Sequence, residues 1–388
     1  MKTLIELYDE RPIENVLSSE VFRPETTVFI CPPNVASNAH LQNHLRQYFR
    51  HRGLRNKCKF IPASIYDVAS VEKNLREVLN RYPDCALDIA GGSESALFAG
   101  GRLCASWDIP VFTYSSKRNC FFNIQNAEFA HNRPCTVELR VEDCFLMAGG
   151  AMREGRVDNR ILHRYMHLFD PFFRVFMEHR RIWTKAITYI QRISQKDPGS
   201  LHAEGGITEK GEHGRRVSVP RELLKSLEKL DMIRNLSITE ERVSFDFADA
   251  WIRTWLRDVG SVLELYIYKV CLDSGVFKDV VTSAVVDWLG EESGHSNITN
   301  ELDVMGTSGV RSAFISCKTC EAKTEALNEL AILRDRFGGR MASAAIVTAE
   351  NGSSAMLHRA TELGIDVIDL RDLRNPDVMR ERIRALMR

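Results

Sequence analysis

The stretch Asn300–Thr319, NELDVMGTSGVRSAFISCKT, consists of two strand-like runs joined by a turn rich in Gly, Ser and Thr. Residues i and i+2 of a strand point to the same face. We therefore expect Glu301 and Asp303 to share one face, and Ser316 and Lys318 to share one. If the two runs pair as a hairpin, the acids and the lysine meet at one end of it.

A further acid, Glu264, lies in the segment VLELYIYKVCL, which has the pattern of a buried helix. Mg²⁺ and Mn²⁺ prefer two or three carboxylate oxygens completed by a carbonyl and waters. A lysine beside such a cation can orient a water and offset the charge of a phosphorane-like transition state. The residue types therefore point to phosphodiester hydrolysis.

This order of helix Glu, hairpin Asp and strand Lys resembles the PD-(D/E)xK nuclease superfamily. The longer pattern NELDVM…FISCKT…LNELAILRDRFGGRMASAAIVT is similar to CRISPR ancillary nucleases that carry an N-terminal CARF domain and respond to cyclic oligoadenylate. The resemblance implies that Asp303 is the principal metal ligand and Lys318 the catalytic lysine. It also implies a backbone-carbonyl ligand at Cys317 and identifies Glu264 as the helix acid.

Ser316 departs from the superfamily pattern, which has Glu or Asp at this position. Either the metal site recruits Glu301 or Glu264 instead, or the site is weakened or inactive. We expect activity with a relocated carboxylate. The structural alternative, in which Glu301, Asp303 and Lys318 are ordinary surface residues, loses weight when the helix acid and the flanking apolar strands are considered together.

The totals restrict the class of protein. A chain of 388 residues predicts two or three domains. Because 52 Lys+Arg balance 52 Asp+Glu, the net charge gives no information about the kind of partner. No apolar run is long enough for a membrane span, and we do not expect the start, MKTLIELYDERP, to act as a signal peptide. The ten irregularly spaced cysteines are typical of reduced thiols, so we expect a cytoplasmic protein.

Residues 1–150 alternate strand-like and helix-like segments, which predicts an α/β fold with a doubly wound, Rossmann-like parallel sheet. Ligands of such sheets bind at the loops after the strands. The expected strands are 3–8, 27–32, 58–63, 85–90 and 111–116.

Residues 151–245 are helix-rich, basic and aromatic, with an expected break at Pro171 and a winged-helix-like outline near 218–246. Their aromatic residues fit either a core or interface, or contact with single-stranded nucleic acid. Residues 246–388 return to an α/β pattern that predicts a restriction-endonuclease-like domain. Its expected elements are helices 248–273, 322–337 and 353–363 and strands 279–288, 300–305, 311–317, 343–348 and 365–369.

The segment LDIAGGSESALFAGG, residues 87–101, reads as a strand, a glycine turn and a helix. Gly91 and Gly92 would let backbone amides approach a ligand, and Ser93 or Ser95 would cap the helix, which makes an anion site. Glu94 argues against a bare phosphate cradle, because it would repel an anion. The alternative is a tight turn without a ligand.

Neighbouring loops carry further candidate binding residues. Arginine can grip phosphate in a bidentate manner, and asparagine can contact adenine. With the glycine turn, these loops resemble CARF domains, which are Rossmann-like dimers that bind cyclic oligoadenylate across their twofold axis. The candidates are Asp9, Arg11, Pro12 and Asn15 after the first strand, and Ser115, Ser116 and Lys117 after the last.

The hypothesis from sequence is a homodimeric, metal-dependent nuclease of type III CRISPR antiviral defence. Its expected activator is cyclic oligoadenylate, tetra-adenylate in preference to hexa-adenylate, and its cofactor Mn²⁺ or Mg²⁺. Its substrate would be DNA or RNA, single-stranded or transiently opened, and cutting could take the form of nicking. No membrane partner is expected. Two alternatives stay open: a non-catalytic ring sensor that binds nucleic acid, and a ring nuclease that degrades its own ligand.

Overall fold

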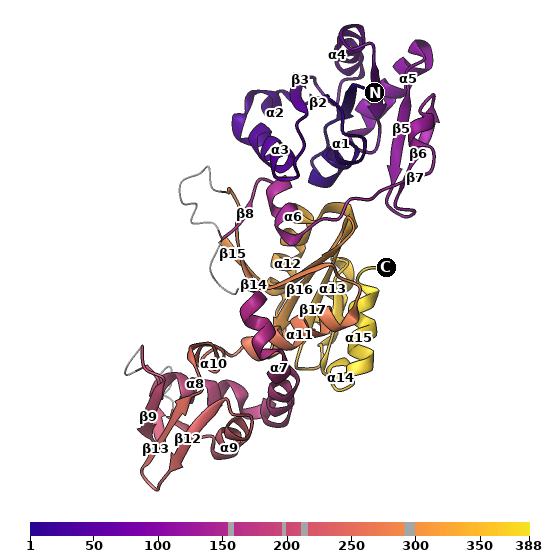
Figure 1. The fold of residues 1–388 in the computed structure, drawn as a ribbon. Coiled ribbons are helices and arrows are strands. Elements are labelled where there is room, and N and C mark those ends of the chain that lie inside the picture. Colours follow the sequence, from indigo (N-terminus) through magenta and orange to yellow (C-terminus); the bar gives the residue numbers. More distant parts are fainter. Residues whose placement is uncertain (154–158, 196–198, 211–215, 291–298) are drawn as a thin grey trace.

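The computed structural model of the protein describes residues 1–153, 159–195, 199–210, 216–290 and 299–388. Three parts are stacked along one axis (Figure 1). The N-terminal part lies at one end, the C-terminal part lies in the centre, and the middle of the chain forms the other end. All ten cysteines are free. Within the described ranges, no helix has the length and apolarity needed to span a membrane.

The N-terminal part is built on a seven-stranded sheet of order β3-β2-β1-β4-β5-β6-β7. The first five strands are parallel and confirm the expected strands to within two residues at their ends, whereas the antiparallel β6 and β7 were not predicted. The strands are β1 (Thr3–Leu7), β2 (Thr26–Cys31), β3 (Lys57–Pro62), β4 (Cys85–Asp88), β5 (Val111–Ser115), β6 (Cys120–Gln125) and β7 (Arg133–Pro134). The strand order reverses between β1 and β4, where such sheets bind ligands.

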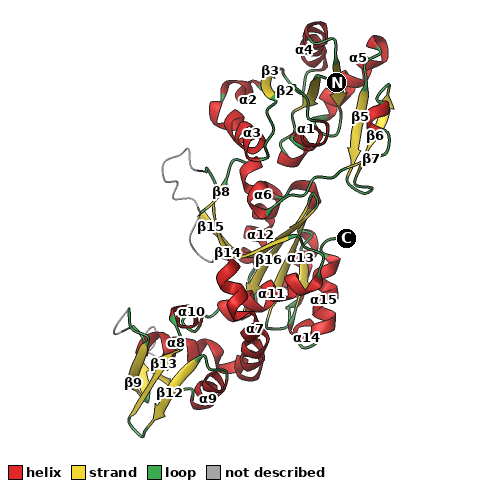
Figure 2. Ribbon diagram, in the orientation of Figure 1, coloured by secondary structure: helices red, strands yellow, loops and turns green. Residues whose placement is uncertain are grey.

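Helices cover both faces of this sheet (Figure 2). Several begin where a side-chain oxygen accepts a backbone amide: Asn38 caps α3, Asp67 caps α4, and Ser93 is the cap of α5. The elements are η1 (Pro12–Asn15), α1 (Leu17–Phe22), α2 (Pro33–Ser37), α3 (Ala39–His51), α4 (Val68–Arg81), α5 (Glu94–Trp107) and η2 (Glu128–Ala130).

The C-terminal part is a six-stranded sheet of order β18-β17-β16-β15-β14-β8. The pairs β8–β14, β14–β15 and β15–β16 are antiparallel, and the pairs β16–β17 and β17–β18 are parallel. This confirms the expected hairpin. The strands are β8 (Ala151–Met152), β14 (Asp279–Asp287), β15 (Thr299–Ser308), β16 (Arg311–Lys318), β17 (Ala342–Thr348) and β18 (Asp366–Ile368).

Two groups of helices pack on opposite faces of this sheet and bury different sets of strand residues. The helix expected at 248–273 is two helices, α10 and α11, separated by a turn. One face holds α11 (Ser261–Ser274), α14 (Leu370–Leu373) and α15 (Pro376–Ala385). The short helix α10 (Ala250–Trp255) packs instead against the middle part of the chain. The other holds α6 (Val141–Met147), α12 (Thr324–Phe337), η6 (Gly339–Met341) and α13 (Ser354–Glu362).

The middle part contains a three-stranded sheet of order β12-β13-β9 and a separate β10-β11 pair. Its aromatic side chains, Phe172, Phe176, Trp183 and Tyr189, are fully buried, which confirms the core alternative for them. The elements are α7 (Asn159–His179), η3 (Arg180–Ile182), α8 (Trp183–Ile193), β9 (His202–Gly206), β10 (Thr208–Lys210), β11 (Arg216–Ser218), α9 (Arg221–Lys229), β12 (Ile233–Ile238) and β13 (Arg242–Phe247).

The predicted break at Pro171 is wrong, because Pro171 lies inside the continuous helix α7. A proline in a helix interior costs about 3 kcal/mol through its missing N–H and its clash with the preceding turn. Burial of Phe169 and Phe172 on either side offsets this cost. Fully burying one such side chain contributes about 1.5–3 kcal/mol.

The N-terminal and C-terminal sheets share one hydrophobic core. The link is α6, whose Phe145 ring packs edge-to-face against Phe337 of α12 at 5.2 Å. Backbone contacts reinforce it: Thr307 Oγ1 donates to the Leu139 carbonyl at 2.7 Å, and the Val141 amide donates to Asp279 at 2.9 Å. Residues 135–152 are therefore part of the packing of the C-terminal sheet.

Gly338 tests the tight packing at the end of α12. An added Cβ would lie 2.2 Å from Ala342 Cβ and 2.7 Å from the Phe314 ring. We expect Gly338→Ala to lower the free energy of unfolding by about 1–3 kcal/mol or more, because overpacking strains a filled core. Denaturant unfolding measures this change.

Gly101→Ala on α5 is the matched control, because nothing lies within 4 Å of its added methyl group. A helical Gly→Ala change in open space should stabilise by up to about 1 kcal/mol. Equal effects of the two substitutions would contradict the close approach at Gly338.

Candidate active site

Asp303 sits where the C-terminal sheet separates locally. In the β14–β15 ladder, Thr282 pairs with Val304 and Ala284 with Leu302, so Ser283 and Asp303 lie opposite each other in the same register but form no ladder pair. Ser283 has a φ of 52°, a left-handed conformation that is costly for a residue other than glycine. On the other side, the β15–β16 ladder ends at Val304. The backbone at Asp303 thus forms no regular strand pair on either side.

Three donors converge on one oxygen of Asp303. The Cys317 amide lies 2.6 Å from Oδ2, the Ser316 hydroxyl 3.0 Å and the Lys318 ammonium 3.3 Å. Among the described residues none donates a hydrogen bond to Oδ1 of Asp303. Ser316 therefore helps to orient Asp303.

Lys318 is half-buried beside this carboxylate. Burial alone would lower the pKa of Lys318, but attraction to Asp303 outweighs it and raises the pKa above its ordinary value. Lys318 is consequently an ammonium at neutral pH. It is suited to stabilise negative charge rather than to accept a proton.

Glu264 approaches from α11, and its Oε2 accepts a hydrogen bond from Ser283 at 2.8 Å. Burial, followed by repulsion from Asp303, raises the pKa of Glu264 to about 8. Glu264, Glu301 and Asp303 line one cavity of about 440 Å³, together with Asp258 and Ser283. The structure therefore brings together the three acids that the sequence singled out.

A second, smaller cavity of about 40 Å³ lies against α12. The four predicted hairpin residues Glu301, Asp303, Ser316 and Lys318 line it. Glu329 of α12 closes it and accepts a hydrogen bond from the Asn300 side chain. The hairpin residues thus meet at one end of the ladder, as expected.

The donor set suits a hard cation that keeps several waters. In the described part of the chain, no three His, Cys, Asp or Glu side chains are close enough to hold a metal by themselves. Mg²⁺ is commonly held by one or two carboxylates and completed by waters and substrate phosphate. The open Oδ1 of Asp303 and the Glu264 carboxyl group across the cavity, which a bound cation would help to ionise, fit that mode of binding.

Ser283 and Glu329 were missed by sequence reasoning. Neither belongs to a recognisable motif. Ser283 matters because of its irregular backbone, and Glu329 because of the side of α12 that faces the hairpin. Charged or polar residues one helical turn from an apolar strip are common, so the sequence carried no usable signal.

The N-terminal candidates meet at the switch point between β1 and β4, where Asp9 is the centre. Its carboxylate receives the Arg11 guanidinium in a bidentate pair of 2.9 Å contacts and the Gly92 amide at 3.0 Å. Asn15 brackets the Asp9 backbone at 2.9 and 2.7 Å. The Arg11 and Gly92 donors that sequence analysis offered to a ligand phosphate are therefore engaged by an internal carboxylate.

The remaining N-terminal candidates border the same edge of the sheet. Gly91 packs against Asp9, since an added Cβ would lie 3.0 Å from Asp9 Cβ. Ser93 donates to the Ile65 carbonyl at 2.5 Å and caps α5, and Glu94 is in the first turn of that helix. Pro12 opens η1. Ser115 is the last residue of β5, which pairs with β4, and Ser116 and Lys117 follow it.

Below this edge lies a group of buried carboxylates that sequence reasoning missed. Burial raises the pKa of Glu14 to about 7 and that of Asp88 to about 6, and raises that of Glu6 well above its usual range. Asp88 accepts a hydrogen bond from Ser18. The β1 loop is thus held by buried polar contacts from beneath.

The turn after α12 touches these N-terminal loops. An added Cβ at Gly339 would lie 3.8 Å from both Arg11 Cβ and Ile13 Cγ2. The Tyr114 hydroxyl, one residue before Ser115, lies 3.8 Å from the Met341 sulfur. One end of α12 therefore meets the ligand-loop candidates, and Glu329 on the same helix closes the small cavity at Asp303.

Comparison with known proteins assigns the C-terminal part. Residues 254–386 match the family model described as Card1-like, endonuclease domain, whereas no curated protein sequence matches the chain. The protein VC1899 from Vibrio cholerae has a similar structure, with a TM-score of 0.75 at 17% identity, over 99% of this chain and 97% of that one.

A second similar structure is that of Can2 from Sulfobacillus thermosulfidooxidans, solved in complex with cyclic tetra-adenylate. It has a TM-score of 0.71 at 15% identity and covers 100% of this chain and 99% of the other. At such low sequence identities, the structural similarity establishes a common fold and nothing more. The C-terminal part of the chain therefore matches a Card1-like endonuclease domain, and the whole chain shares the fold of VC1899 and Can2.

Proposed function

We propose that the protein is a metal-dependent nuclease activated by cyclic oligoadenylate. The observation that carries the proposal is the arrangement at Asp303. One carboxylate oxygen is fixed by an amide, a hydroxyl and an ammonium, and the other has no donor among the described residues beside a cavity that contains Glu264. This combination suits hydrolysis of a phosphodiester.

In this proposal, a divalent cation would be held by Asp303, Glu264 or Glu301, and the Cys317 carbonyl, and would supply Lewis acidity toward the scissile phosphate. Lys318 lies next to Asp303 and offsets the negative charge that develops on the phosphoryl oxygens. Ser316 and the Cys317 amide hold Asp303 in position.

The N-terminal edge between β1 and β4 would bind the ring. Two observations support this assignment: the candidate loops meet at the switch point of the sheet, and the fold is shared with Can2, which was solved with cyclic tetra-adenylate. Because Asp9 already engages Arg11 and Gly92, we propose that these residues shape the loop and that Lys117, Ser115 and Ser116 face the phosphates. Residues 1–150 would be the CARF-like domain.

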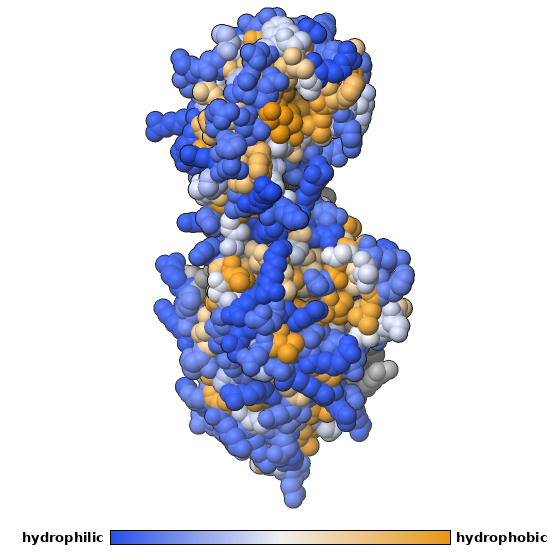
Figure 3. Space-filling model, turned by 90° about the vertical axis from the view of Figure 1, so that its right-hand side faces the viewer, coloured by the Kyte–Doolittle hydropathy of each residue, from blue (hydrophilic) through white to orange (hydrophobic). Residues whose placement is uncertain are grey.

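A homodimer would form through the N-terminal parts, because a twofold ring fits an isologous receptor. Exposed apolar side chains of this part support an interface: Phe98 of α5 is 59% exposed and Ile124 of β6 is 56% exposed. Figure 3 shows apolar surface on the upper, N-terminal part of the face that includes these elements. The cellular role would be type III CRISPR defence.

Activation would pass through α12. The turn η6 that follows α12 lies close to Arg11 and contacts Tyr114, and Glu329 of α12 lines the small cavity at Asp303. A ligand shifts a conformational equilibrium only through a difference in affinity between two states. A ring that binds better to one position of the loops would therefore favour one position of α12.

Asp303→Asn tests the catalytic assignment. It keeps the size of the side chain but removes the negative charge that a cation needs. We expect ring-stimulated cleavage of labelled single strands in Mn²⁺ to fall by about two orders of magnitude or more, with the melting temperature almost unchanged.

Asp366→Asn, an exposed carboxylate on β18, is the control and should cut like the wild type. Retained cleavage in Asp303→Asn would refute the site. Ring and strand binding without cleavage by the wild type in every divalent metal would favour a sensor instead, a role that the absence of a carboxylate at position 316 permits.

Glu264 makes the stability of the metal-free protein depend on pH. Its folded pKa of about 8 lies above its ordinary value of 4.5, so its proton stabilises the fold at low pH and this contribution is lost as pH rises toward 8. In EDTA, we expect the wild type to lose about 1–3 kcal/mol relative to Glu264→Gln between pH 5 and about pH 8.5. Chemical unfolding at both pH values measures this difference, and parallel pH profiles would contradict it.

Met341→Ala tests the coupling through α12. Met341 and Met356 are both buried in the shared core, and Met341 contacts Tyr114, the residue before the ligand-loop candidate Ser115. Each change to Ala should cost about 2–5 kcal/mol of stability. We expect only Met341→Ala to lower the ratio of cleavage rates with and without the ring, by about threefold or more. Equal ratios in both variants would exclude this route.

A further inference from the structure

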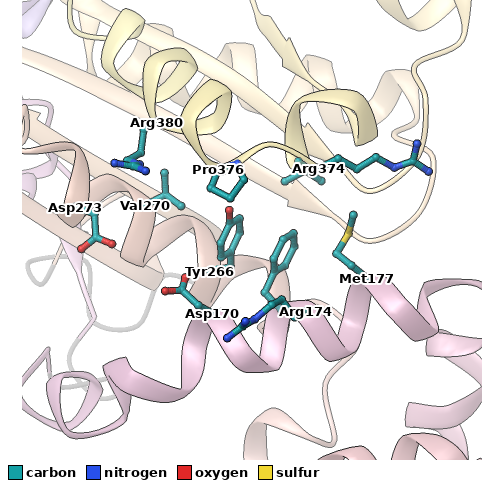
Figure 4. A pocket seen from close by; sticks show the side chains of 11 residues that line it. Asp170, Arg174, Met177, Tyr266, Val270, Asp273, Arg374, Pro376 and Arg380 are labelled. Atoms are coloured by element: carbon teal, nitrogen blue, oxygen red, sulfur yellow. The ribbon is translucent and has the colours of Figure 1, made fainter.

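Two cavities outside the sites described above differ in their charge. The cavity of about 900 Å³ in Figure 4 lies between α7 and α11, and Asp170 and Asp273 line it together with arginines. A cavity of about 390 Å³, the α3–β3 cavity, is lined by the C-terminal half of α3, the start of β3 and the turn between them. Four cations and no acid line this second cavity: Arg46 and Arg50 of α3, and Lys57 and Lys59 of β3.

The sequence around the α3–β3 cavity carries an excess of positive charge. Although the whole chain has 52 Lys+Arg and 52 Asp+Glu, residues 26–66 contain six Lys and Arg and no acid. Of these six cations, Arg52 is paired with Glu20 and Asp143, each at 3.0 Å. Within the described ranges the other five form no ion pair: Arg46, Arg50, Arg55, Lys57 and Lys59.

The four cations of the cavity form two pairs with similar spacing. Arg46 and Arg50 are four residues apart on one face of α3, which separates them by about 6 Å along the helix axis. Lys57 and Lys59 are two residues apart on one face of β3, which separates them by about 6.6 Å along the strand. Cations repeated at such intervals suit a chain of phosphates better than a single phosphate.

The two arginines are held in place without losing all of their donors. Arg46 donates to the Gln42 and Asn43 side chains at 2.8 and 3.3 Å, and its guanidinium lies 5.1 Å from the centre of the Phe60 ring. Arg50 Nε donates to the Arg46 carbonyl at 3.3 Å. A guanidinium has five N–H donors, so each arginine keeps donors for a ligand.

Protection of the sheet edge explains only part of this charge. β3 forms one edge of the N-terminal sheet (Figure 1), and lysines on an edge strand discourage pairing with another chain. Arg46 and Arg50 are on α3, where that role does not apply. The cavity also lies at the start of β3, whereas the ring-binding candidates follow the opposite ends of the parallel strands.

We propose that the α3–β3 cavity binds the phosphate backbone of a single-stranded nucleic acid. Lysine and arginine contacts to phosphates are independent of base sequence and gain free energy from the release of counterions. The large apolar side chains that line the cavity, Phe49 and Leu54, are only 2% and 6% exposed. Because surfaces that bind membranes expose apolar side chains, this polar cavity fits a nucleic acid better than a lipid bilayer.

This site goes beyond the proposed nuclease function. A strand held there would be tethered to the N-terminal part of the protein, and its binding needs neither a metal, nor the ring, nor Asp303. Binding measured in EDTA without the ring therefore does not depend on cleavage. Failure of the nuclease proposal would leave the result intact, and loss of this site would leave the assignment of Asp303 open to its own test.

Fluorescence anisotropy of the full chain with a labelled deoxythymidylate strand of about 15 nucleotides tests the site, in EDTA and over a series of salt concentrations. The logarithm of the affinity for a single strand falls with the logarithm of the salt concentration by about 0.7 for each phosphate contact. We expect Arg50→Ala/Lys57→Ala/Lys59→Ala to reduce this slope by about 2 and to weaken binding at low salt by about tenfold or more.

Lys73→Ala/Arg76→Ala/Arg81→Ala is the matched control, because it removes three exposed cations from α4 in the same part of the chain. It should bind like the wild type. Lys57→Arg/Lys59→Arg keeps both charges and should retain the wild-type slope, which separates loss of charge from a defect in folding.

Equal slopes in the wild type and in Arg50→Ala/Lys57→Ala/Lys59→Ala, or equal losses in that variant and the α4 control, would overturn the proposal. Displacement of the strand by inorganic phosphate, but not by chloride at equal ionic strength, would also overturn it and indicate a site for a single phosphate. So would loss of binding to vesicles of phosphatidylserine and phosphatidylcholine with strand binding unchanged, which would indicate a membrane surface. Self-association of Lys57→Ala/Lys59→Ala with unchanged strand binding would leave edge protection as the role of these lysines and overturn the proposal.

Discussion

The molecule depends on the way one carboxylate is held at a gap in a sheet. Asp303 receives an amide, a hydroxyl and an ammonium on a single oxygen because neither neighbouring strand pairs with it regularly. A buried, half-paired carboxylate is costly unless its donors are fixed. The strained Ser283 opposite, which also holds Glu264, shows that local backbone cost is accepted where charge must be concentrated.

The N-terminal loops also hold a carboxylate with fixed donors, but there the carboxylate is fully paired within the protein. Asp9 is paired with Arg11 and the Gly92 amide, and the acids beneath it are shielded from water. The carboxylate at Asp303 is left partly open, while that at Asp9 is satisfied internally. One arrangement suits exchange with a cation and substrate, and the other suits a loop that keeps its shape and can transmit a change in position to Gly339 and Met341.

Sequence patterns predicted the local elements well because hydrophobic periodicity and caps act over a few residues. The five parallel strands, the hairpin, and the meeting of Glu301, Asp303 and Lys318 follow from such patterns. They failed where distant segments decide the outcome. Pro171 stays helical because its neighbours are buried by other elements, and Arg11 turns to Asp9 because the loop folds back on itself. The pairing of β8 with β14 also joins residues that no local pattern connects.

That pairing has a consequence for how the protein is made. β8 completes the edge of a sheet whose other strands follow the whole middle part in the sequence. In the same way, Phe145 packs against Phe337, which is far later in the chain. During synthesis, α6 and β8 leave the ribosome long before their partners exist, so an apolar segment stays uncovered for the interval. Only after β14 and α12 have been translated would this segment be covered, and a chain that ends before them would retain the exposed segment as a target for chaperones or proteases.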